Sequence, residues 1–172
     1  MNKRINISQY IAEGLIFLAL GIIQFTPGLL PRIFGGLPLP LIPAVICVAM
    51  FEREFAGAMF GLASGMMWDV FSIEIAGFNA IFLLVIGCVA GLLINFLMRN
   101  NLITALLLTG GTMVIYQTLY TLFFFLPAED ISGIGFIIYA RLIPSLIYTM
   151  LFVPVIYFVI RATVRKLKPT DT

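Results

Sequence analysis

Long apolar runs with very few charges dominate this sequence and restrict the environments in which the chain can fold. Apolar residues make up 62% of its 172 residues and charged residues only 10%, and the mean hydropathy is +1.12. Soluble domains carry about 25% charged residues. In a bilayer, an apolar run can satisfy its backbone hydrogen bonds by forming a helix. The sequence therefore predicts an all-α, polytopic membrane helix bundle.

Charged and Pro/Gly-rich breaks divide the chain into six apolar segments. A helix crosses about 30 Å of hydrocarbon with roughly 20 apolar residues. The second segment is the weakest, because it is short and contains Pro38, Pro40 and Pro43, so it is either a full span or a re-entrant stretch. A charged turn, Glu52-Arg53-Glu54, separates it from the third segment. The expected transmembrane helices are 8–25, 37–51, 55–72, 76–98, 102–126 and 134–160, within one integral membrane domain over residues 1–172.

Basic residues favour six transmembrane helices over five. With six, both termini lie on one side of the membrane, and eight of the ten Lys and Arg residues fall on that side. Five would place one basic terminus on the opposite side. Because Lys and Arg in short loops mark the cytoplasmic side, we expect both termini to be cytoplasmic.

The residue types that are missing argue against several kinds of catalytic site. The chain contains no histidine, which removes the commonest general base, the usual nucleophile triads and most zinc sites. Cys47 and Cys88 both lie inside apolar runs, so we expect neither a disulfide nor a metal site. The sequence shows no phosphate-binding loop and no nucleic-acid-binding surface. We therefore expect a protein that is not an enzyme, has no cofactor or metal, and contacts membrane lipids rather than nucleic acid.

Two stripes of glycine run along the third and fourth predicted helices. Residues four positions apart lie near one face of a helix. In lipid, small residues on such a face let a neighbouring backbone approach closely. The two helices are therefore expected to pack tightly against each other. The stripes consist of Gly57, Gly61 and Gly65 in the third helix and Gly87 and Gly91 in the fourth.

Asp69 occupies the next position of the first stripe, inside an apolar helix. An aspartate near the middle of a membrane helix costs about 2.5 to 3.5 kcal/mol on insertion scales and normally needs a partner. At 1.5 Å per residue, Asp69 and Arg141 both lie about 10 Å inside the outer edge of the hydrocarbon. We hypothesise that they pair and join the third helix to the sixth. The alternative is that Arg141 reaches out to the lipid headgroups.

The last predicted helix contains two prolines, Pro144 and Pro154. Each proline removes a helical hydrogen bond and tends to kink the helix. The freed carbonyl groups need a neighbouring donor, such as the hydroxyl of Ser145 or Thr149, or water. The kink beside Arg141 is therefore a candidate groove, although simple curvature around the bundle would also explain it.

Taken together, several segments of the chain resemble the rod shape-determining MreD family. The resemblance spans nearly the whole chain, and its most specific part is the glycine stripe that ends in Asp69 and is followed by Gly77. The segments are Pro38-Leu-Pro40, Phe60-Gly61-Leu-Ala-Ser-Gly65-Met-Met-Trp-Asp69-Val-Phe-Ser72, Gly77-Phe78-Asn79-Ala80 and Tyr139-Ala-Arg141-Leu-Ile-Pro144-Ser-Leu-Ile-Tyr148.

The resemblance implies a function and a fold. Members of this family are non-enzymatic components of the bacterial cell-elongation machinery in the cytoplasmic (inner) membrane. Such a protein would bind MreC directly and through it link MreB to the peptidoglycan synthases, and its fold would resemble the substrate-binding subunit of energy-coupling-factor transporters. The glycine faces, Asp69, Arg141 and Pro144 would then shape a partner surface. Whether the protein forms a homodimer stays open.

The alternative function is that of a vitamin-binding membrane subunit of an energy-coupling-factor transporter. Those subunits commonly carry an Ala-xxx-Ala spacing on the first helix, where they meet their transport partner. Here the corresponding stretch is Ala12-Glu-Gly-Leu-Ile16, which lacks that spacing. The sequence therefore favours the cell-elongation function.

Overall fold

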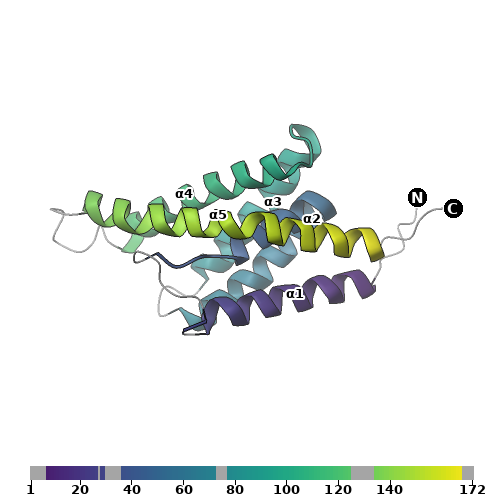
Figure 1. Ribbon diagram of the computed structural model, residues 1–172, viewed down its shortest axis with the longest axis horizontal. Coiled ribbons are helices and arrows are strands. Elements are labelled where there is room, and N and C mark those ends of the chain that lie inside the picture. The colour runs from purple at the N-terminus through teal and green to yellow at the C-terminus, as the bar shows by residue number, and fades with distance from the viewer. Residues whose placement is uncertain (1–6, 27, 30–35, 73–76, 125–133, 168–172) are drawn as a thin grey trace.

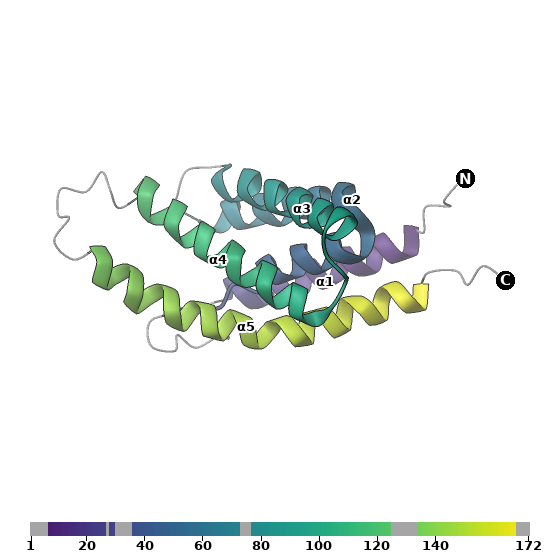
Figure 2. The ribbon, with the colours of Figure 1, turned by 90° about the horizontal axis from the view of Figure 1, so that it is seen from above.

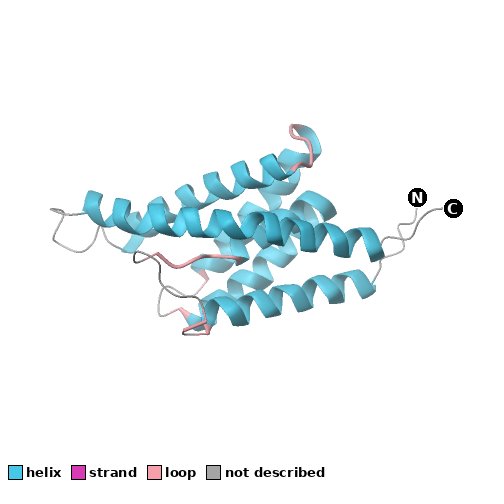
Figure 3. Ribbon diagram, viewed as in Figure 1, coloured by secondary structure: helices cyan, strands magenta, loops and turns pink. Residues whose placement is uncertain are grey.

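A bundle of five helices makes up the regular part of the computed structural model (Figure 1). The structure describes residues 7–26, 28–29, 36–72, 77–124 and 134–167, and for residues 7, 124, 134–142 and 167 it describes the backbone alone. Within these residues, short loops connect helices, as Figure 3 shows. The helices are α1 (Ile7–Phe25), α2 (Leu41–Phe71), α3 (Phe78–Phe96), α4 (Leu102–Phe124) and α5 (Ile134–Leu167).

Four of the five helices are long and apolar enough to cross a membrane. This agrees with the expected all-α membrane architecture. Most of the segments predicted at 37–51 and 55–72 falls within α2, where a non-helical residue, Arg53, separates two helical halves. The spans that meet the length and hydropathy requirements are Ser8–Phe25, Phe78–Phe96, Leu102–Phe123 and Ile143–Lys166.

The chain reverses direction inside α2, at Arg53. This residue has φ 76° and ψ −176°, which no α-helix contains. In an uninterrupted helix, Ala49 and Gly57 would lie about 12 Å apart along the axis. Instead, a Cβ built on Gly57 would lie 2.5 Å from the Ala49 Cβ. The helix therefore has two halves, 41–52 and 54–71, that fold back on each other at the charged turn expected from the sequence.

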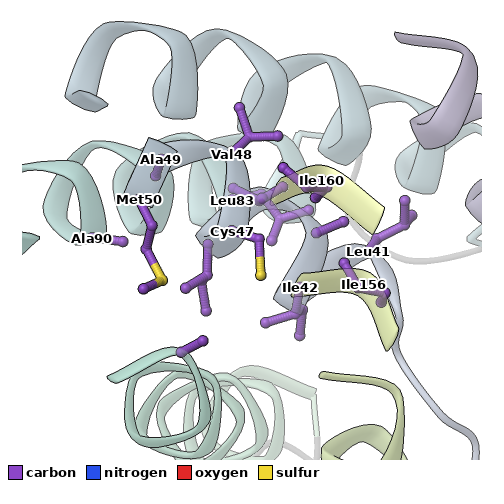
Figure 4. Close-up of a cluster of buried hydrophobic side chains, with 14 of the residues drawn as sticks. Leu41, Ile42, Cys47, Val48, Ala49, Met50, Leu83, Ala90, Ile156 and Ile160 are labelled. Carbon is purple, nitrogen blue, oxygen red and sulfur yellow. The ribbon is translucent and has the colours of Figure 1, made fainter. Parts of the chain in front are cut away.

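The first half of α2 lies in the core of the bundle. Leu41, Ile42 and all residues from Ala44 to Ala49 are fully buried. They belong to one core cluster, and Figure 4 shows Ile42, Cys47 and Val48 packed together with Leu83 of α3 and with Ile156 and Ile160 of α5. At 1.5 Å per residue, this half is about 18 Å long, which is shorter than the hydrocarbon core of a bilayer. Other helices rather than lipid therefore surround it.

A non-helical segment, 36–40, leads into this buried half along α5. The Ser145 hydroxyl donates a hydrogen bond to the Leu37 carbonyl (2.6 Å), and the Leu39 amide donates to the Thr149 hydroxyl (3.0 Å). A Cβ on Gly36 would meet the backbone of Pro144 and Ser145. Non-helical backbone inside a membrane protein needs such partners from the protein itself. Consequently, the chain's own residues cover α5 where it passes Pro144.

The start of α1 and the end of α5 lie at the same end of the bundle, which we call the terminal end (Figures 1 and 2). The turn at Arg53 lies at this end as well, since the Gln9 amide of α1 donates a hydrogen bond to the Glu52 carboxylate (2.7 Å). The opposite, distal end holds the end of α1 and the end of α2, where the Phe25 and Phe71 rings stack 4.8 Å apart. This arrangement is what an even number of membrane crossings produces.

Replacing Arg53 with glycine should stabilise the protein. Its backbone conformation is almost exclusive to glycine and costs other residues about 1 to 3 kcal/mol. We therefore expect Arg53→Gly to raise the free energy of unfolding by about 1 kcal/mol in denaturant titrations of the purified protein in mixed micelles. Arg53→Ala is the matched control, because it removes the charge but keeps the strained backbone. An equal gain in both variants would show that charge, not backbone strain, is responsible.

Candidate functional site at the distal end

The Asp69 carboxylate lies in the last turn of α2 and faces the first turn of α3. Its Oδ2 atom accepts hydrogen bonds from the backbone amides of Gly77 (3.0 Å) and Ala80 (3.1 Å). Its Oδ1 atom accepts hydrogen bonds from the backbone amide of Asn79 (3.1 Å) and from the Asn79 side-chain amide (2.9 Å). Asp69 therefore caps the N-terminus of α3 from the preceding helix.

The hydrogen bonds between Asp69 and α3 satisfy polar groups of both helices. The first amides of any helix lack partners within the helix and carry a partial positive charge, which a carboxylate neutralises. The residue at the N-cap position of α3, Gly77, has no side chain that could do this and adopts the left-handed conformation (φ 95°). In return, Asp69 receives the donors that a carboxylate in an apolar helix requires. The contact thus fixes the end of α2 against the start of α3.

Asn79 and Tyr116 extend the hydrogen bonds of Asp69 to a third helix. The Asn79 side chain is fully buried, and its Oδ1 atom accepts a hydrogen bond from the Tyr116 hydroxyl of α4 (2.9 Å). The Tyr116 ring lies 5.4 Å from the ring of Trp68 and 5.1 Å from that of Phe82. One polar network, walled by aromatic rings, therefore links α2, α3 and α4 near the distal end.

The glycine stripes of α2 and α3 meet backbone to backbone. A Cβ on Gly61 would clash with the Leu83 carbonyl, and one on Gly65 with the Ala80 backbone. Closer to the Arg53 turn, Gly57 and Gly87 face each other in the same way, and Gly91 lies against the backbone of Glu54. The second half of α2 and α3 are consequently in contact along almost their whole length. Both stripes therefore pack helix against helix within the molecule.

The hypothesised partner of Asp69 cannot be placed in this network. The side chain of Arg141 lies outside the residues that the structure describes, so the Asp69–Arg141 pair stays a prediction. The partners of Asp69 are backbone amides of the next helix, which the sequence pattern did not predict. A signal was present: the next helix begins after Gly77, which has no side chain to cap it, and the preceding helix carries an aspartate in its last turn.

The arrangement at the distal end suits a structural or docking role. Each Asp69 oxygen accepts two hydrogen bonds from the first turn of α3, so the carboxylate is held in place. In the described part of the chain, no cluster of three or more His, Cys, Asp or Glu residues is placed to hold a metal ion. The network thus fixes the positions of three helices.

A comparison with known families gives one match. The model of the family described as rod shape-determining protein MreD matches residues 8–167. That range includes all five helices apart from the first residue of α1. No curated protein and no solved structure matches the chain.

Removing the Asp69 carboxylate should destabilise the protein more than removing the Tyr116 hydroxyl, which lies at the other end of the same hydrogen-bond network. Asp69→Ala takes away the acceptor of four hydrogen bonds, and hydrogen bonds to charged groups contribute about 1.5 to 3 kcal/mol. We expect a loss of about 3 kcal/mol in the free energy of unfolding. Tyr116→Phe removes one neutral donor and should cost about 1 kcal/mol. Equal losses in denaturant titrations would contradict the capping role of Asp69.

Proposed function

The chain belongs to the rod shape-determining protein MreD family, and on this basis we propose that it is a non-enzymatic scaffold or regulator of the bacterial cell-elongation complex. In this role it binds MreC and thereby links MreB to peptidoglycan synthesis, maintaining rod shape. The observation that carries the proposal is the family match over residues 8–167, which includes the Asp69 cap and both glycine stripes. The four helices long enough to span a membrane support a multi-pass location.

We also propose that the chain crosses the cytoplasmic membrane six times, with both termini in the cytoplasm. The reversal at Arg53 supports this, because it divides α2 into two antiparallel halves. The distribution of charge supports it as well. Arg161, Arg165 and Lys166 lie in the last turns of α5, at the same terminal end as Arg53. Since basic residues mark the cytoplasmic side, the distal end with Asp69 then lies toward the outer face.

The packing suggests how a protein of this kind acts on a partner. The backbone contact between α2 and α3, the Asp69 cap and the Asn79–Tyr116 hydrogen bond hold three helices in a fixed arrangement. Binding sites supported in this way lose little conformational entropy when the partner docks. We therefore propose that the bundle presents a preformed surface to MreC. The lipid-facing sides of the helices provide that surface, because α2 and α3 already use their glycine faces on each other.

Complementation in a rod-shaped bacterium tests this function. A strain depleted of its own MreD family protein should remain rod-shaped when this chain is expressed together with the MreC of its own host. The tagged chain should also co-purify with that MreC from detergent-solubilised membranes. Cell length and width in phase-contrast images provide the measurement.

Two outcomes would contradict the proposal. One is that cells become round although the chain is present in the membrane at the level of the native protein. The other is that mass spectrometry finds a vitamin bound to the purified protein in a one-to-one ratio, which would favour the transporter-subunit alternative. Asp69→Ala should restore rods less well than the unchanged chain at equal membrane levels, and Arg53→Ala should restore them fully.

A further inference from the structure

Two carboxylates share one amide near the terminal end of the bundle. The Gln9 Nε2 atom donates hydrogen bonds to Glu13 Oε1 (3.1 Å) and to Glu52 Oε1 (2.7 Å). Gln9 and Glu13 lie one turn apart on α1, and Glu52 lies in the last turn before the Arg53 reversal. We call these three residues the Gln9 cluster. Both hydrogens of the Gln9 amide are in use, so it has none left for another acceptor.

Glu13 lacks a partner for its second oxygen. The side chain is fully buried, and its Oε2 atom has no hydrogen-bond partner among the described residues. Buried polar atoms in proteins are nearly always paired, and a buried carboxylate is especially costly without donors. At the distal end, by contrast, both oxygens of Asp69 are satisfied. The Gln9 cluster therefore has one buried oxygen, Glu13 Oε2, that is available to a further donor.

The surroundings of the cluster favour a cationic donor. Tyr10 and Phe17, on either side of Glu13 in α1, both stack on Phe60 of α2, with ring centroids 6.3 and 5.0 Å apart. Apolar walls of this kind lower the local dielectric and strengthen the attraction between opposite charges. Glu52 is only partly buried, so it marks the side from which a ligand could enter.

We propose that the Gln9 cluster is a binding site for one basic side chain, a lysine ammonium or an arginine guanidinium, carried by a partner protein at the terminal end. Such a group brings several N–H donors and a positive charge. Its N–H groups match the acceptors of the cluster, which are the partly exposed Glu52 and the Glu13 oxygen that lacks a partner. Charge complementarity selects this occupant, because the cluster contains two carboxylates and one neutral amide. The inference goes beyond the proposed function, since any partner with such a side chain would fit.

A lipid-anchored peptide can test this site. The probe is a fluorescent myristoylated peptide with a single arginine close to the acyl chain. Its control contains citrulline, which has nearly the same shape but no charge. Binding to the full-length protein is measured in phosphatidylcholine nanodiscs, which carry no net charge. We expect the arginine peptide to bind at least about tenfold more tightly than the citrulline peptide.

Substitutions in the protein test whether the preference for the arginine peptide depends on the Gln9 cluster. Glu13→Gln and Glu52→Gln should each abolish most of the preference for arginine, because each keeps the shape of the side chain and removes its charge. Glu54→Gln is the matched control. Glu54 lies in the same turn and also has a buried oxygen without a partner, but its side chain is not hydrogen-bonded to Gln9 and its backbone packs against Gly91 of α3. If Glu13→Gln does not fold, Glu52→Gln gives the same test at a partly exposed position. Equal binding of both peptides, or an equal loss of preference in Glu54→Gln, would overturn the proposal.

Discussion

The hydrogen bonds between the Asp69 carboxylate and the first amides of α3 are the interaction on which the rest of the structure depends. They hold the end of α2 at the start of α3 and so set how the two helices align. With this alignment, Gly61 meets Leu83 and Gly57 meets Gly87, and the two backbones can touch. A shift by one residue would rotate the glycines away from the contact and bring larger side chains into it. The cap and the glycine stripes therefore act as one unit.

Carboxylates at the two ends of the bundle differ in how completely hydrogen-bond donors satisfy them. At the distal end, Asp69 is neutralised by backbone amides and by Asn79, and Tyr116 extends the network to α4. At the terminal end, Glu13 and Glu52 share the single amide of Gln9, and one Glu13 oxygen is left without a donor. The first arrangement is complete within the molecule and fixes its shape. The second is incomplete and so is suited to a partner.

Much of the fold follows from the sequence, because its main signals are local. Apolar runs mark the helices, the Glu52-Arg53-Glu54 turn marks the reversal, and the four-residue spacing of glycine marks the close contact of α2 with α3. The partners of Asp69 could not be predicted from the sequence, because nearly every residue has a backbone amide. Only the three-dimensional course of the chain determines which three amides reach the carboxylate. The Gln9 cluster was not predictable for a similar reason, because Gln9 and Glu52 lie 43 positions apart in the sequence. The burial of 41–50 depends on how the other helices surround that segment.

A double-mutant cycle between Asp69→Ala and Gly61→Ala tests most directly whether the cap sets the alignment of the two glycine stripes. The residues lie about 12 Å apart along α2, a distance at which independent effects on stability add within about 0.5 kcal/mol. If Asp69 holds Gly61 against Leu83, the added methyl group should cost at least about 1 kcal/mol less once Asp69 is replaced. Gly111→Ala, at a glycine with open space around it, should show no coupling with Asp69→Ala. Additive losses at Gly61 would contradict the account.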